Sequence, residues 1–304
     1  MEYIIETRNL TKKYGKHFAA DGVNLHVKRG EIYGFIGTNG AGKTTCMKMI
    51  CGLAEQSEGE IMLFGKTEDE SHALRERIGS LIEEPGLYYD MTAYQNMKFK
   101  CKLSGIRDYS CIEEILKLVD LQNTGKKTVK KFSFGMRQRL GIALALVGNP
   151  DVLVLDEPIN GLDPQGIARI REILVKLRDE KNLTIMVSSH ILEELSKIAD
   201  TFGIIHKGKL IEEISREELL SRCQNHVEIN TDNPQLACVI LEESGIKEFK
   251  VTDSQTLNIM GHLDETAKIN ELLVGNGCKI KQLKIVSVDI EDYYFKKTSG
   301  GAEK

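Results

Sequence analysis

The sequence has no tryptophan, only 5 prolines among its 304 residues, and no apolar run long enough to span a membrane. A membrane-spanning helix needs about 20 mostly apolar residues, and the most apolar stretch, LGIALALVG at 140–148, is about half that length. The N-terminal MEYIIETRNL also lacks the positive charges and the cleavage site of a secretory signal. We therefore expect a cytoplasmic chain with no transmembrane segment of its own.

Paired cysteines are absent as well. The 7 cysteines form no C-x-x-C pair and no Cys/His cluster with the spacing of a zinc site. A scattered, odd number of cysteines is typical of reduced thiols in a cytosolic protein. We expect none of them to be catalytic or to bind a metal.

An excess of positive charge is also missing. The chain has 41 Lys and Arg against 45 Asp and Glu, a net charge of -4. A general nucleic-acid binder needs a basic surface, so we expect no nucleic-acid partner. With 304 residues, 41% hydrophobic and 28% charged, the chain has the composition of a globular protein and is long enough for two domains.

Strand and helix patterns alternate over residues 1–214 and predict an α/β fold. The first 37 residues contain strand patterns that end directly before a glycine-rich loop, and residues of about 86–148 have helical periodicity. DVLVLDEP at 151–158 is apolar until it reaches two acids, which is typical of a central strand in a parallel sheet. A helix, a buried strand (LTIMVSSH, 183–190) and another helix follow.

Residues 215–304 have a different pattern. Segments between 226 and 297 predict the order strand, helix, strand, strand, helix, strand, with a closing helix. That order matches a ferredoxin-like βαββαβ unit. No motif in this unit carries chemistry, so we predict a smaller α+β accessory domain with a structural or regulatory role.

GTNGAGKTT at 37–45 matches the P-loop pattern G-x-x-x-x-G-K-[ST]. In such a loop the backbone N–H groups and a lysine bind nucleotide phosphates, and the hydroxyl of Thr44 is a ligand for Mg²⁺. The residues that we expect to contact the nucleotide here are Gly37, Thr38, Asn39, Gly40, Ala41, Gly42, Lys43, Thr44 and Thr45.

The two acids that end DVLVLDEP complete the nucleotide site. We expect Asp156 to hold Mg²⁺ and Glu157 to polarise the water that attacks the γ-phosphate. No N-K-x-D motif for guanine recognition is present, which argues against a GTPase.

FSFGMRQRL at 132–140 decides which P-loop family the sequence resembles. It is similar to the ABC signature L-S-G-G-Q followed by x-Q-R, with Ser133 and Gly135 at the serine and second glycine positions. The resemblance to the ABC ATPase family covers residues 1 to about 210. It implies a RecA-like core, a helical subdomain at about 86–148 and an N-terminal antiparallel β subdomain, together forming a nucleotide-binding domain at 1–214.

The same resemblance assigns further site residues. Ser133, Gly135 and Met136 would bind the γ-phosphate of an ATP held by another subunit, so that two copies, or this chain and a related ATPase subunit, dimerise head to tail around ATP. Tyr14 in KKYGK would stack on adenine, and Asp163 in NGLDP would lie at the dimer interface. His190 at the end of MVSSH would contact the γ-phosphate and is, with Glu157, a predicted catalytic residue.

Four positions depart from the family pattern. Glu83 stands where a glutamine is usual, and we expect it to ligate Mg²⁺ as well. Phe134 and Met136 replace a glycine and a glutamine of the signature, which leaves open a site that does not hydrolyse ATP. Thr38 replaces a proline outside the phosphate-binding turn.

The resemblance is nearest to the ATP-binding subunits of bacitracin- and lantibiotic-type bacterial exporters, through IGSLIEEPGLYYDMTAYQNM, FSFGMRQRL and VDIEDYYFKKT. It implies a Mg²⁺-dependent ATPase, bound to a separate membrane permease at the inner face of the cell membrane, that exports an antimicrobial peptide or similar compound. The alternative is a non-transport ABC ATPase of the translation or DNA-repair type. KKTVKK at 126–131 is either a solvated loop or a contact with the permease or lipid headgroups.

Overall fold

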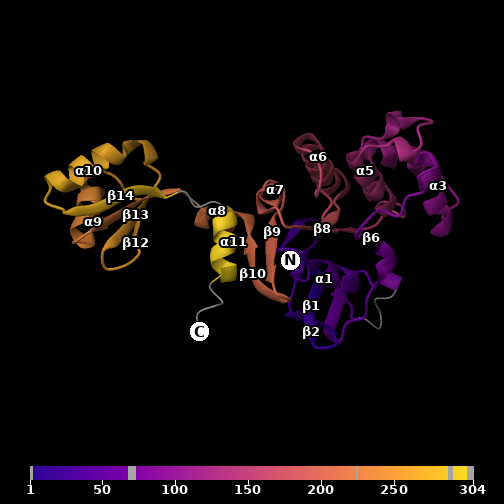
Figure 1. Cartoon of the computed structure of the whole chain (residues 1–304), viewed down its shortest axis with the longest axis horizontal. Helices are drawn as coiled ribbons and strands as arrows, with labels where there is room; N and C mark the ends of the chain where they lie inside the picture. Colours follow the sequence, from indigo (N-terminus) through magenta and orange to yellow (C-terminus); the bar gives the residue numbers. More distant parts are fainter. Residues whose placement is uncertain (1–2, 68–72, 224, 287–289, 300–304) are drawn as a thin grey trace. The chain divides into compact units, whose positions relative to one another are not determined.

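A computed structural model describes residues 3–67, 73–223, 225–286 and 290–299. The chain forms two compact units, Met1–Arg216 and Glu217–Lys304 (Figure 1). Of the VDIEDYYFKKT segment, the first two residues lie outside the described ranges. No helix in these ranges combines the length and the apolar character that a membrane crossing requires.

A six-stranded sheet forms the centre of the first unit. Its strands, in the order β10-β9-β4-β8-β7-β6, are β10 (Lys209–Ser215), β9 (Thr201–His206), β4 (Ile32–Ile36), β8 (Thr184–Ser189), β7 (Val152–Leu155) and β6 (Ile78–Leu81). Neighbouring strands are parallel except β9 and β10, which are antiparallel. All four residues of β7 are buried, so the predicted central strand of a parallel sheet is confirmed.

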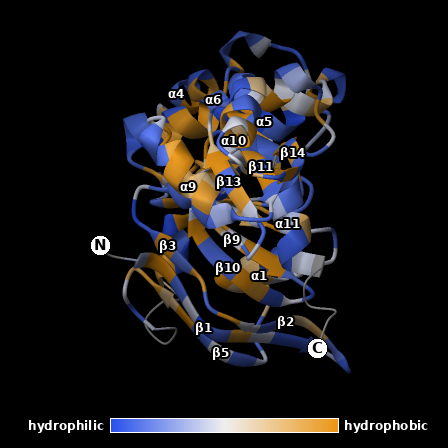
Figure 2. Ribbon diagram, turned by 90° about the vertical axis from the view of Figure 1, so that its left-hand side faces the viewer, coloured by the Kyte–Doolittle hydropathy of each residue, from blue (hydrophilic) through white to orange (hydrophobic). Residues whose placement is uncertain are grey.

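A second, antiparallel sheet is built around β1 (Tyr3–Tyr14). It pairs with β2 (His17–Val23), β3 (His26–Lys28) and β5 (Glu58–Leu63), all in antiparallel fashion. Fully buried side chains of this sheet, such as Ile5, share one core cluster with Phe35 of β4 and Met47 of α1. Figure 2 shows hydrophobic colour around the labels of β9 and β10 and hydrophilic colour at the lower edge, near the label of β5.

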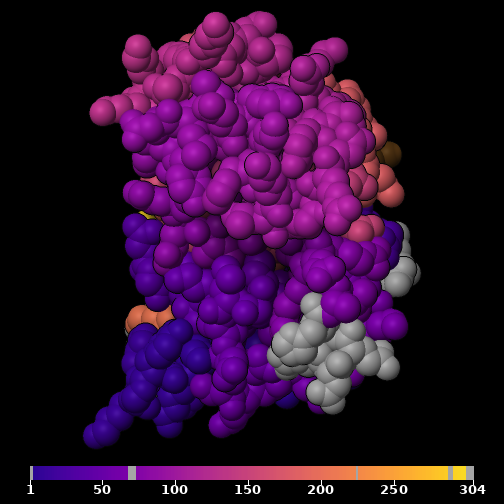
Figure 3. Space-filling view, turned by 90° about the vertical axis from the view of Figure 1, so that its right-hand side faces the viewer, coloured from indigo at the N-terminus to yellow at the C-terminus, as the bar shows by residue number. Residues whose placement is uncertain are grey.

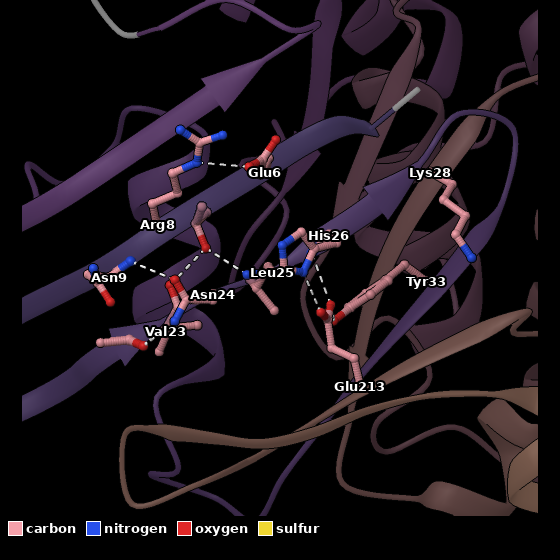
Figure 4. Close-up of polar contacts among 12 residues, drawn as sticks. Glu6, Arg8, Asn9, Val23, Asn24, Leu25, His26, Lys28, Tyr33 and Glu213 are labelled. Carbon is pink, nitrogen blue, oxygen red and sulfur yellow. Dashed lines mark hydrogen bonds and ion pairs between the residues drawn. The ribbon is translucent and has the colours of Figure 1, made fainter. Parts of the chain in front are cut away.

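Glu213 of β10 joins the two sheets through polar contacts (Figure 4). Its Oε1 accepts hydrogen bonds from the backbone N–H of His26 at 2.9 Å and from the hydroxyl of Tyr33 at 2.6 Å. Its Oε2 lies 2.6 Å from Nδ1 of His26. Burial, and then the charge of Glu213, raise the pKa of Tyr33 well above its ordinary value, so Tyr33 remains the proton donor in this contact.

The helices of the first unit alternate along the chain with the strands of the six-stranded sheet. They are α1 (Lys43–Ile50), α3 (Ala93–Leu103), α4 (Cys111–Leu118), α5 (Phe134–Ala145), α6 (Pro164–Lys181) and α7 (Leu192–Ser196), with 3-10 turns η1 (Ala73–Arg77), η2 (Gln122–Thr124) and η3 (Val129–Lys131). Thr92 and Gln95 start α3 with a capping box. In Figure 3 the residues from α3 to α5 cover the upper part of the face, and the N-terminal strands lie below them.

The second unit contains a four-stranded antiparallel sheet in the order β12-β13-β11-β14. Its elements are α8 (Arg216–Arg222), β11 (His226–Thr231), α9 (Pro234–Glu243), β12 (Phe249–Val251), β13 (Thr256–Met260), η4 (Leu263–Glu265), α10 (Thr266–Gly275), β14 (Ile280–Val286) and α11 (Ile290–Ser299). Buried residues of β11 and β13 pack with α9 and α10. The element order and sheet order are those of a ferredoxin-like fold, as predicted.

Candidate functional site

The glycine-rich loop connects β4 to α1 at the carboxyl end of the parallel sheet. Gly42 has a φ of 110°, and a Cβ placed on it would lie 2.3 Å from the carbonyl oxygen of Ala19. Only glycine fits this position without moving the backbone. The close approach also brings the β1–β2 hairpin, which contains Ala19, against the loop.

The N-terminus of α1 is suited to an anion. No side chain caps the helix at Gly42, and its first turn contains no acid. The first N–H groups of a helix have no partner within the helix and carry partial positive charge, which favours phosphate. Lys43 adds a full charge: its side chain is 5% exposed, and its ammonium donates to the carbonyl oxygens of Gly37 at 2.6 Å and Thr38 at 3.3 Å.

Asp156 and Thr44 form an oxygen-rich pair beside this helix start. The hydroxyl of Thr44 donates to Oδ2 of Asp156 at 2.7 Å, and that of Ser188 donates to Oδ1 at 2.6 Å. Asp156 is 7% exposed. Mg²⁺ prefers oxygen ligands and is usually held by one or two carboxylates together with waters and phosphates, so these residues fit the ion.

No group of three or more His, Cys, Asp and Glu side chains within the described ranges could hold a metal by itself. If Mg²⁺ binds at the Thr44–Asp156 pair, phosphates and water would supply its remaining ligands. Mg²⁺ bound there would neutralise phosphate charge during transfer.

Glu157 lies between Lys43 and His190. Its Oε1 is 3.2 Å from Nζ of Lys43, and its Oε2 is 2.9 Å from Nδ1 of His190. The backbone of Glu157 has a φ of 48°, and its N–H donates to the hydroxyl of Ser188 at 2.9 Å. A glutamate is uncommon in this left-handed region, and the Ser188 contact helps to hold it there. The carboxylate is thereby fixed at the edge of the phosphate-binding loop, where it can accept a proton from water.

Glu83, the third residue predicted to bind Mg²⁺, is not joined to the Thr44–Asp156 pair. Its Oε1 lies 2.5 Å from Nζ of Lys48 on α1, and its side chain is 64% exposed. Sequence reasoning did not anticipate this ion pair, because the two residues are 35 positions apart. A role of Glu83 toward the metal stays a prediction.

The two other segments predicted to contact the nucleotide or the dimer partner, which contain Ser133 and Asp163, each precede a helix. Ser133 caps α5, where its hydroxyl accepts from the N–H of Met136 at 3.3 Å. Asp163 caps α6, where its carboxylate accepts from the N–H of Gly166 at 2.9 Å. Both helix starts line one groove of about 720 Å³, together with Gly135. The groove therefore presents two helix N-termini to the same space.

Phe134 also lines this groove and is 44% exposed. A Cβ placed on Gly161 would be 3.6 Å from Cε1 of Phe134, so the ring packs against the loop that precedes α6. The side chain that replaces the family's glycine thus contacts the Asp163 loop within the same chain.

Asp120 is a residue of this region that sequence reasoning missed. Its Oδ2 lies 3.1 Å from Nη1 of Arg139 on α5 and 3.0 Å from Nη2 of Arg169 on α6. Its backbone has a φ of 58°, in the left-handed region. Asp120 therefore connects the two helices whose N-termini line the groove. A lone aspartate after a predicted helix gives no signal of such a contact.

Tyr14, the predicted adenine partner, ends β1 and is 54% exposed. Nζ of Lys12 lies 5.2 Å from its ring centroid. Stacking on adenine stays a prediction.

The helix α1, which follows the glycine-rich loop, also contains Cys46, whose side chain is completely buried. Burial raises the pKa of this thiol to about 12.

Comparisons with known proteins identify the family. Residues 20–160 match the family model described as ABC transporter. The bacitracin transport ATP-binding protein BcrA of Bacillus licheniformis is 42% identical over 304 residues, covering 99% of both chains. The lantibiotic transport ATP-binding protein SrtF of Streptococcus pyogenes is 46% identical over 208 residues, covering 68% of this chain and 89% of its own.

Solved structures that are similar to this chain include the following two. The structure of cbiO1 from Clostridium perfringens, part of the ABC transporter complex cbiONQ, has a TM-score of 0.66 and 30% identity, and covers 73% of this chain and 92% of that chain. The dimeric post-hydrolysis state of the ATP-binding cassette MJ0796, bound to ADP and Pi, has a TM-score of 0.62 and 26% identity, and covers 70% and 98% of the two chains.

Proposed function

The chain belongs to the ABC transporter family as an ATP-binding subunit, and we propose that it drives a separately encoded membrane permease that exports an antimicrobial peptide or a similar amphipathic compound. The observation that carries the proposal is the similarity to BcrA, which extends over 99% of both chains and so includes the C-terminal unit. The alternative of a non-transport ABC ATPase is not supported, because the relatives are named as transport proteins.

The predicted enzyme class, an ABC-type ATP hydrolase, is confirmed by family membership. We assign the role of general base to Glu157, with His190 holding the carboxylate and contacting the γ-phosphate. The 2.9 Å contact between these two side chains supports the assignment. Lys43 would bind the phosphates, and Thr44 with Asp156 would hold Mg²⁺.

The working state in this proposal is a head-to-tail dimer with ATP between the two copies. Ser133, Gly135, Met136 and Asp163 would then contact the nucleotide or the loop of the opposite copy. The groove of about 720 Å³ between the starts of α5 and α6 supports this arrangement, because it offers helix N-termini to a phosphate. Pairing with a related ATPase subunit would use the same groove.

A second groove suits the permease. It has a volume of about 350 Å³ and is lined by apolar side chains of α3 and α5, by Leu53 after α1, and by residues next to Glu83. Leu53 and Leu103 are 62% and 70% exposed, so the groove carries apolar surface that a docked segment would cover. A cytoplasmic segment of the permease docked here would touch the Glu83 loop and keep the protein at the inner face of the membrane.

The proposal also assigns residues 1–214 to ATP hydrolysis and 215–304 to an accessory domain. Its test is co-expression with the separately encoded permease in a bacitracin-sensitive and lantibiotic-sensitive host, with Glu157→Gln as the matched inactive control. Export predicts that the minimal inhibitory concentration of one such peptide rises at least severalfold with the wild type and not with the control. Equal sensitivity in both strains, with the proteins present at the membrane, would count against peptide export.

A further inference from the structure

Lys48, which lies in the same helix as Thr44, forms an ion pair with Glu83. Nζ of Lys48 lies 2.5 Å from Oε1 of Glu83, with side chains 32% and 64% exposed. Lys48 follows Thr44 by four residues in α1, so both side chains lie on the same face of the helix, one turn apart. Lys48, which contacts Glu83, therefore follows Thr44 by about one helical turn, or about 5 Å along the helix axis.

The loop that contains Glu83 starts at the metal site. The carbonyl oxygen of Leu81, the last residue of β6, accepts from the N–H of Asp156 at 2.8 Å. Two further residues along the chain, about 7 Å at full extension, lead to Glu83. A rotation within this short segment can thus move the carboxylate from Lys48 toward Thr44 and Asp156.

We propose that Lys48 is a positioning residue that holds Glu83 away from the Thr44–Asp156 pair until Mg²⁺ and ATP bind. The inference rests on the proposed ATPase function and deepens it. A glutamine at position 83 is neutral and would not be held by a lysine in this way; the acid and the lysine work as a pair. An exposed ion pair contributes little, so a metal with its phosphates can displace it.

The Glu83 loop provides the first test, without nucleotide. Hydrogen–deuterium exchange of residues 82–86 in the full chain should become faster in Lys48→Met than in the wild type. Lys181→Met is the matched control, because it removes another 2.5 Å ion pair of similar exposure, with Glu114. Unchanged exchange in Lys48→Met, with both variants folded, would overturn the proposal.

Metal binding provides the second test. In the Glu157→Gln background, binding of a fluorescent ATP analogue is titrated with Mg²⁺ in a double-mutant cycle of Lys48→Met and Glu83→Gln. With Glu83 present, Lys48→Met should lower the half-saturating Mg²⁺ concentration by about two- to fivefold, the size of effect that an exposed pair carries. When Glu83→Gln has already removed the acid, the same lysine change should have no such effect.

The outcomes separate this inference from the function on which it rests. An equal effect of Lys48→Met in both backgrounds would show a general charge effect and overturn the positioning role. If no variant bound the nucleotide with Mg²⁺, the ATPase assignment would fail, while the exchange measurement would still decide whether Lys48 holds the loop.

Discussion

Nδ1 of His190 lies 2.9 Å from Oε2 of Glu157, and the two residues come from the ends of neighbouring parallel strands, β8 and β7. The contact fixes one carboxylate oxygen, while Lys43 lies 3.2 Å from the other. Glu157 therefore has a defined orientation before any substrate enters. Such preorganisation is what a general base needs, since its geometry must be correct when water loses its proton.

Replacement of this carboxylate should separate nucleotide binding from hydrolysis. Glu157→Gln keeps the shape of the side chain but removes the base, so ATP turnover should fall by about 10² to 10⁴. Size exclusion with light scattering should then detect an ATP-dependent dimer that the hydrolysing wild type does not accumulate. Turnover close to that of the wild type would mean that another group accepts the proton.

Thr44 offers a test of the metal pair. Thr44→Ala removes the hydroxyl that donates to Asp156 at 2.7 Å, and the half-saturating Mg²⁺ concentration for ATP hydrolysis should rise by about 10- to 100-fold. Thr44→Ser keeps the hydroxyl and should restore most of the affinity. If Thr44→Ala and Thr44→Ser required the same Mg²⁺ concentration as the wild type, the assignment of this pair to the metal would be wrong.

Two glycines of the loop should respond differently to alanine. In Gly42→Ala the new Cβ would meet the Ala19 carbonyl at 2.3 Å, so the loop must shift and phosphate binding should be lost. Gly40 has a φ of 78° but no atom within 4 Å of the new Cβ, so Gly40→Ala should cost only about 1–2 kcal/mol of backbone strain. Nucleotide binding and urea denaturation of the two variants would measure the contrast; tight binding by Gly42→Ala would contradict it.

Asp120 can be tested through its backbone as well as its charge. Asp120→Asn keeps a residue that tolerates the φ of 58° and should lose about 1 kcal/mol through its arginine contacts. Asp120→Ala should lose about 1 kcal/mol more, because alanine is less stable in the left-handed backbone region. Urea denaturation measures both, with the exposed Asp179→Asn as a control; equal stabilities for Asp120→Asn and Asp120→Ala would exclude backbone strain.

Glu31 predicts a pH dependence of stability. This buried carboxylate accepts hydrogen bonds from the N–H of Lys28 and the hydroxyl of Thr201, yet burial raises its pKa above the ordinary value of a glutamate. Because the folded state binds this proton more tightly, the contribution of Glu31 to stability is largest below the unfolded pKa and falls as the pH rises through the folded pKa.

The variant Glu31→Gln removes that titration. The melting temperature of the variant minus that of the wild type should therefore be more positive at about pH 8 than at about pH 4.5. Thermal unfolding at both pH values in one buffer series provides the measurement. If this difference changed in the opposite direction between the two pH values, or did not change, burial would not be what sets the pKa of Glu31.

Much of the fold was predictable, because its signals are local. The apolar run before Asp156 identified β7, and the strand, helix and strand order after residue 226 identified the ferredoxin-like unit. The short strands β5 and β6 were not predicted. β6 has only four residues, one of them Gly79, whose missing side chain lets the Ala145 backbone approach, and such a segment has no periodicity to detect.

The site was predictable to the extent that its residues follow strand ends. Parallel strands end at one edge of a sheet, so Glu157 and His190 meet there in the structure as their positions in the sequence suggest. The contacts of Glu83 with Lys48 and of Asp120 with two arginines depend on side-chain conformations between distant segments. No pattern within a single segment contains that information.

The buried thiol of Cys46 also affects how this protein can be handled. Electrophilic reagents react with thiolates, and a cysteine with a pKa of about 12 and no exposed surface offers neither ionisation nor access. Alkylating reagents are therefore not expected to modify α1 at Cys46. Maleimide dyes attached to cysteines engineered elsewhere on the cassette would leave Cys46 unmodified.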